Sequence, residues 1–207
     1  MTAAQRERSA LVSTFRQVGP LAPTLCEGWN TTDLAAHLVV RERRLDATAG
    51  IAVPFLADYT AKVQDKTAQS NSWEALVELV ATGPPIYSPF KLLDPVANLG
   101  EMFIHHEDVR RAVDGWQPRE LDATTTSRLR RQLGLMSRLM LSKMPAQVVL
   151  QTAAGERIAR VGRGDVVTIT GEPQELLLFV AGRDAVRVEF DGDAGAVAAV
   201  RSAPRGL

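Results

Sequence analysis

The hydrophobic pattern changes near Pro145, and this change limits the folds open to the chain. Before Pro145, apolar residues recur at helical spacing in segments that end at glycine or proline, as at 83–85. After it, the segments 147–152 and 157–161 are strand-like, with a turn residue, Gly155, between them. The sequence therefore predicts an α+β protein in which helices come first and a small sheet follows.

The same pattern divides the chain into two predicted domains. We expect a helix bundle over 1–145 and a small α+β domain over 146–207. The second part is near the size at which a domain folds poorly alone, so we expect it to dock on the bundle. The predicted elements are helices at 2–18, 31–50, 55–66, 71–82, 95–113, 122–143, 173–182 and 193–200, and strands at 147–152, 157–161, 166–170 and 186–190.

Charge and cysteine content exclude several classes of protein. Lysine plus arginine and aspartate plus glutamate both number 24, so no basic surface for nucleic acid is indicated. The charged segment 5–8 lies where a signal peptide needs its apolar core, and no apolar run reaches the roughly 18 residues of a membrane span. We expect a cytoplasmic protein with no membrane partner. The single cysteine, Cys26, leaves histidine and carboxylate as the ligands for any metal.

Two residues in the predicted helix 95–113 suggest a metal site. Glu101 and His105 are four positions apart, so their side chains lie on one face of the helix. The apolar spacing of Met102 and Val109 turns this face toward the bundle interior. The adjacent His106 points about 100° away, which makes it the rival that the geometry disfavours.

A third candidate ligand, His37, lies on the apolar face of the predicted helix 31–50. Two imidazoles and a carboxylate suit zinc, and three protein ligands leave a position for water or substrate. Manganese, iron or nickel also bind such a set. The alternative, of equal weight on spacing alone, is that both histidines are hydrogen-bonded core residues and that Glu101 is a surface acid.

The segment 25–38, LCEGWNTTDLAAHL, resembles the first metal motif of the mycothiol-dependent maleylpyruvate isomerase family, within the DinB-like superfamily. The segment 101–105, EMFIH, is similar to the family's second motif. The resemblance implies a DinB-like up-down helix bundle with a metal site formed by His37, Glu101 and His105. It also implies a sterol-carrier-like C-terminal α+β domain, as the pattern after Pro145 suggests.

For function, the resemblance implies a zinc- and mycothiol-dependent isomerase or S-transferase, with a small-molecule thiol and an electrophilic substrate as partners. A metal at the open position lowers the pKa of a bound thiol, and the thiolate is the nucleophile. One alternative is a metal- or small-molecule-binding protein of the same fold without turnover. Another is that Cys26 is itself the reactive thiol, although a structural cysteine is the simpler interpretation. Neither the substrate nor the oligomeric state follows from the sequence.

The neighbours of these residues have simpler interpretations. Asp33 is either a hydrogen-bond acceptor for His37 or a helix-start acid. Trp29 is expected to anchor its loop in the core. The charged positions at the end of the predicted helix 95–113 are expected to form a solvated surface: Glu107, Asp108, Arg110 and Arg111.

Overall fold

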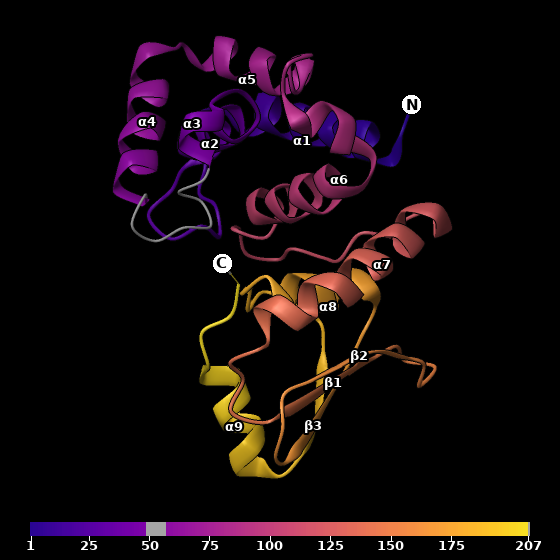
Figure 1. The fold of residues 1–207 in the computed structure, drawn as a ribbon. Helices are drawn as coiled ribbons and strands as arrows, with labels where there is room; N and C mark the ends of the chain where they lie inside the picture. The colour runs from indigo at the N-terminus through magenta and orange to yellow at the C-terminus, as the bar shows by residue number, and fades with distance from the viewer. Residues whose placement is uncertain (49–56, 207) are drawn as a thin grey trace. The chain divides into compact units, whose positions relative to one another are not determined.

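The computed structural model describes residues 1–48 and 57–206 and divides the chain into two compact units (Figure 1). The first unit is Met1–Gln117 and the second is Pro118–Leu207. This division comes before helix α7 (Ala123–Met140), whereas the sequence placed it after residue 145. The reason is that α7 packs against elements of the C-terminal unit, helix α8 (Pro173–Val180) and strand β2 (Arg157–Val161). Docking of the second unit on the first stays a prediction.

The N-terminal unit is a helical bundle, as predicted. Its helices are α1 (Ala3–Val18), α2 (Thr31–Arg43), α3 (Leu45–Thr48), α4 (Ala57–Ser70), α5 (Trp73–Thr82) and α6 (Pro89–Arg110). Helix α1 packs on α5 and α6, and α2 packs on α4 and α5. The interior contains large buried side chains from three helices, among them Phe15, Leu38 and Met102, each of which contributes about 1.5–3 kcal/mol on burial.

The sequence predicted some helix starts correctly and placed others a few residues from their observed positions. Thr2 and Gln5 form a capping box at the start of α1. Helix α5 begins at Trp73, two positions after the predicted start at 71, and is capped by Ser72, whose hydroxyl accepts from the Ala75 amide. Helix α6 begins at Pro89, six positions before the predicted start at 95, because proline fits the first helical turn without loss of a hydrogen bond. Residues 55 and 56, at the start of the predicted helix 55–66, lie outside the described residues.

The C-terminal unit contains a four-stranded mixed sheet. In sheet order the strands are β2 (Arg157–Val161), β1 (Gln147–Gln151), β3 (Val166–Thr170) and β4 (Glu189–Gly192). The β1–β2 pair is the predicted antiparallel hairpin, whereas β1 and β3 are parallel. The last strand starts three positions later than the 186–190 predicted from its apolar residues. Helix α9 (Ala194–Ser202) follows it, capped by Asp193.

Helix α8 lies at the centre of this unit. All eight of its residues are buried, including the polar Gln174 and Glu175. Helix α7 packs against it, and the two helices lie beside each other in Figure 1. Across residues 1–48 and 57–206, no helix combines the length and apolar character that crossing a bilayer requires.

Candidate metal centre

Three side chains from two helices meet at one point, where two imidazoles approach the same carboxylate oxygen. His37 projects from α2, while Glu101 and His105 project from α6. Glu101 Oε1 lies 3.6 Å from His37 Nε2 and 3.3 Å from His105 Nε2. One ligand atom from each residue falls within 4.8 Å of the other two. The structure thus brings together the three residues that the sequence selected.

The spacing of these atoms fits a small divalent cation. Ligands about 2.0–2.1 Å from a tetrahedral zinc ion lie about 3.3 Å from one another, close to the two measured separations. The Glu101 side chain is 25% exposed, whereas the two imidazoles are 11% and 10% exposed. The cluster therefore opens to solvent beside the carboxylate, where a further ligand would enter.

His37 is oriented from its far side by Gln64 of α4. Its Nδ1 lies 3.3 Å from Gln64 Oε1, and because an amide oxygen only accepts, Nδ1 carries the proton. The Nε2 lone pair then faces Glu101. Burial, together with the nearby His105, lowers the pKa of His37 below its usual value. The neutral imidazole that metal binding requires is thus the stable form.

His105 is oriented by Asp108, one helical turn further along α6. Its Nδ1 lies 2.9 Å from Asp108 Oδ2, so Nε2 is left to face Glu101. Burial opposes charge here, but Asp108, Cys26 and Glu101 together raise the pKa of His105 well above its usual value. Without a metal, His105 carries a proton that a metal has to displace.

Glu101 is held ionised although burial opposes its charge. Contacts with His105 and His37, together with the charge of Arg41, keep the pKa of this carboxyl well below its usual value. Arg41 follows His37 by one turn of α2, and its Nε lies 3.1 Å from Glu101 Oε1. Arg41 Nη1 also donates to Asn98 Oδ1 at 2.8 Å. Arg41 was not predicted as part of the site, although its position four residues after His37 places it on the same helix face.

Cys26, His105 and Asp108 form a second group of adjacent ligand atoms. The half-buried Cys26 Sγ donates to Asp108 Oδ2 at 3.2 Å, the same oxygen that His105 Nδ1 contacts. Because both donors already engage this oxygen, the group is better explained as support for His105 than as a separate site.

His106 lies outside the cluster, as its position on the helix predicted. Its Nδ1 lies 2.7 Å from Glu7 Oε1 and its Nε2 lies 2.9 Å from the Thr14 hydroxyl, both on α1. It is buried, and its role in the structure is to join α1 to α6. His106 thus has partners for both ring nitrogens without Glu101.

The expectation of a solvated surface at the end of α6 is wrong for three of its four residues, whereas the Arg110 side chain is 27% exposed. Glu107 and Asp108 are both 0% exposed, and Arg111 is 3% exposed. Glu107 binds Arg110 at 2.8 Å and Arg111 at 2.6 Å, so its charge is compensated inside the fold. These partners and the packing of neighbouring helices, which sequence spacing does not reveal, allow charged side chains to be buried here.

Two other neighbours settle into structural roles. Asp33 Oδ2 accepts from the Asn30 amide at 3.0 Å in the capping box of α2, while Gln64 takes the position beside His37 Nδ1. Trp29 packs against the buried core, as expected, and its ring centroid lies 5.1 Å from that of His37. Trp29 therefore also forms part of the wall of the histidine cluster.

The fold is that of a known thiol-dependent enzyme. The solved structure of a histidine-to-alanine mutant of mycothiol-dependent maleylpyruvate isomerase matches with a TM-score of 0.63 and 14% identity, over 91% of this chain and 90% of that one. A second structure of the enzyme matches with a TM-score of 0.58 and 16% identity over the same shares. No protein-family model and no curated protein matches the sequence. At these identities the likeness establishes the fold.

Proposed function

We propose that this chain binds a divalent metal ion, with zinc as the first candidate, through His37, Glu101 and His105. The observation that carries the proposal is the convergence of two imidazole nitrogens on one oxygen of Glu101, at 3.6 and 3.3 Å. The donor set of two nitrogens and one oxygen suits zinc, and also manganese, iron or nickel. The burial of both imidazoles supports a site that excludes competing water.

We further propose that the metal serves a thiol reaction, either isomerisation or S-transfer with mycothiol as the thiol. The support for mycothiol is the likeness of the fold to an isomerase described as mycothiol-dependent. Zinc at this site would lower the pKa of a thiol bound at its open position. The resulting thiolate is the nucleophile toward an electrophilic substrate.

The chain's own residues have separate tasks in this reaction. Asp108 and Gln64 hold the two imidazoles with Nε2 toward Glu101, which fixes the ligands before any metal arrives. His105 and His37, together with Arg41, keep Glu101 ionised. The partly exposed side of Glu101 supplies the entrance for thiol and substrate.

The alternative is a protein of this fold that binds a metal or small molecule without turnover. The observation that favours it is Arg41, which shares Glu101 Oε1 with both histidines and so provides an ion pair that persists without a metal. Both candidates keep the same three ligands. They differ in whether the bound molecules react.

Metal analysis of the full chain purified without a histidine tag tests the site. We expect close to one equivalent of metal, or its recovery after added zinc. Less than about a tenth of an equivalent, unrestored by zinc, removes the metal from the proposal. Calorimetry with mycothiol and the zinc-loaded protein then tests the thiol reaction, because absence of mycothiol binding removes the thiol-dependent enzyme from the proposal.

A further inference from the structure

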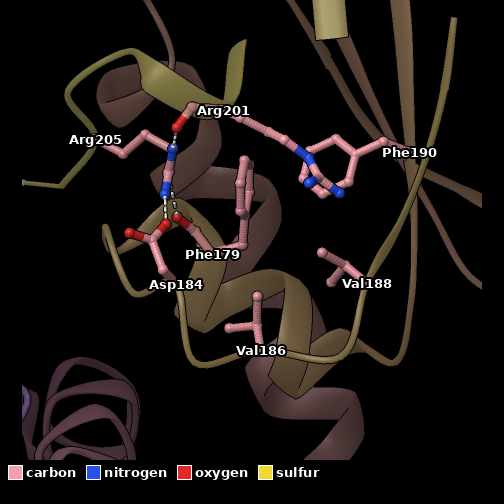
Figure 2. Close-up of a pocket in the computed structure, with 7 residues that line it drawn as sticks. All are labelled: Phe179, Asp184, Val186, Val188, Phe190, Arg201 and Arg205. Atoms are coloured by element: carbon pink, nitrogen blue, oxygen red, sulfur yellow. Dashed lines mark hydrogen bonds and ion pairs between the residues drawn. The ribbon is translucent and has the colours of Figure 1, made fainter. Parts of the chain in front are cut away.

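A second hollow lies entirely within the C-terminal unit, remote in sequence from the histidine cluster. Its volume is about 450 Å³, within the range of small-molecule sites. Figure 2 shows its lining, which comes from the end of α8, the segment that leads into β4, helix α9 and the C-terminal tail: Phe179, Asp184, Val186, Val188, Phe190, Arg201 and Arg205.

One part of this lining is apolar. The rings of Phe179 and Phe190 meet edge to face, with centroids 5.5 Å apart. Val186 and Val188 continue the apolar surface beside them (Figure 2). The hollow therefore offers aromatic and branched aliphatic contacts to the body of a ligand.

Arg205 and Arg201 differ in how many of their guanidinium N–H groups already have partners. Arg205 forms an ion pair with Asp184 and stacks 4.4 Å from the centre of the Phe179 ring. It also donates to the carbonyl oxygens of Phe179 and Arg201. Its side chain is 4% exposed, so we assign it to the structure of the wall.

Arg201 is exposed and stacks 4.3 Å from the centre of the Phe190 ring. Within the described part of the chain, no acidic side chain forms an ion pair with it, and Asp184 is already engaged by Arg205. Stacking fixes the guanidinium plane and leaves its in-plane N–H groups available. That geometry suits a planar carboxylate, which binds two parallel N–H groups.

We propose that this hollow binds a small organic acid, with its carboxylate on Arg201 and its apolar body against Phe179, Phe190 and the two valines. Hydrophilic anions are disfavoured because much of the wall offers them no polar partner. The proposed site shares no residue with the metal centre, since all its residues belong to the other compact unit. Failure of either proposal thus leaves the other standing.

The test uses 3-phenylpropionate as the probe and the ¹⁵N-labelled full chain in NMR titrations. We expect shifts centred on the Arg201 Nε–H group and on the backbone amides of Val188 and Phe190. Three comparison ligands separate the parts of the site: 3-phenylpropionamide lacks the charge, acetate lacks the apolar body, and inorganic phosphate replaces the carboxylate. Each should bind at least about tenfold more weakly.

Variants of the cation complete the test. Arg201→Met should weaken 3-phenylpropionate binding about tenfold or more, and Arg201→Lys should recover only part of the loss, because lysine lacks the planar fork. Arg163→Met, at an exposed arginine outside the hollow, should leave binding unchanged. The proposal is overturned if acid and amide bind equally, if phosphate matches the acid, or if Arg201→Met binds like the parent. Absence of any shift up to about 10 mM probe overturns it as well.

Discussion

The charged side chains around Glu101 and those around Arg201 differ in how completely their charges are paired. Around Glu101, the charged and polar groups come from helix interiors and compensate one another: two imidazoles and a guanidinium share one carboxylate oxygen. In the C-terminal unit, Arg201 stands beside apolar side chains with no acid as partner among the described residues. Converging ligand atoms define a point for an ion, whereas one cation at the edge of an apolar hollow defines a place for an organic anion.

The strongest way to break this comparison is to remove one metal ligand. His37→Ala or Glu101→Ala should lower zinc affinity by more than about 100-fold, because loss of a mere supporting partner already costs 10–100-fold. Competition with a chromophoric zinc chelator measures this. Binding of 3-phenylpropionate should stay unchanged, and a parallel loss there would show that the two sites are not separate.

The matched control is His106→Ala, at the neighbouring position on α6. It removes the contacts with Glu7 and Thr14 and should lower the free energy of unfolding by about 1–3 kcal/mol, since a buried carboxylate loses one of its hydrogen-bond partners. Zinc stoichiometry should remain that of the parent chain. Loss of zinc in His106→Ala would mean that the wrong histidine is assigned.

The next effect concerns the support of a ligand. Asp108→Asn keeps the side-chain size but removes the charge that holds His105 Nδ1, and zinc affinity should fall about 10–100-fold. Glu107→Gln is the control, because Glu107 is equally buried but binds Arg110 and Arg111. Chelator competition at one pH compares the two variants. Equal zinc affinity in both would argue against a positioning role for Asp108.

Acidification should weaken zinc binding with a slope set by His105. Its pKa is raised, so around neutral pH zinc displaces one proton from it, whereas His37 and Glu101, with lowered pKa values, are already deprotonated. Affinity should therefore fall about tenfold when the pH drops from 7.5 to 6.5. Calorimetry in buffers of different ionisation enthalpy counts the protons, and release of none near pH 7 would contradict this assignment.

The smallest effect sharpens the description of the C-terminal hollow. Gly182 has φ +89° and a Cβ there would lie 2.7 Å from the Arg205 carbonyl oxygen, so an added methyl group displaces the tail that carries Arg205. Gly155 also has positive φ, at +77°, but has open space around its Cβ direction. Urea unfolding should show Gly182→Ala to be less stable than Gly155→Ala by about 1 kcal/mol. Equal losses would mean that the tail is not held at Gly182.

The proximity of His37, Glu101 and His105 could be predicted from the sequence because helices impose regular geometry. Glu101 and His105 four residues apart, and His37 on an apolar face, needed only helical periodicity and the resemblance of two motifs. The supporting residues were missed for a physical reason. Burial of Asp108 and Arg41 depends on partners from other segments, and a charged residue at a helix end is usually solvated.

Two other features could not be predicted from the sequence: the boundary between the two units, and the hollow in the C-terminal unit. The apolar stripe of α7 predicts a helix with one buried face but does not identify the element that covers it. The stacking of Arg201 on Phe190 joins β4 to α9, and no periodic pattern relates the two positions. Periodicity predicts which face of a helix or strand is buried, whereas the element that packs on that face is known only from the folded structure.

Asp108 links the two motifs that frame the histidine cluster. Its carbonyl oxygen accepts from the Leu25 amide at 3.0 Å, and its Oδ2 receives both Cys26 Sγ and His105 Nδ1. The loop before α2 is thus fastened to the helix that carries Glu101 and His105. In evolutionary terms, positions 26 and 108 should be constrained as a pair, because their side chains share one hydrogen bond.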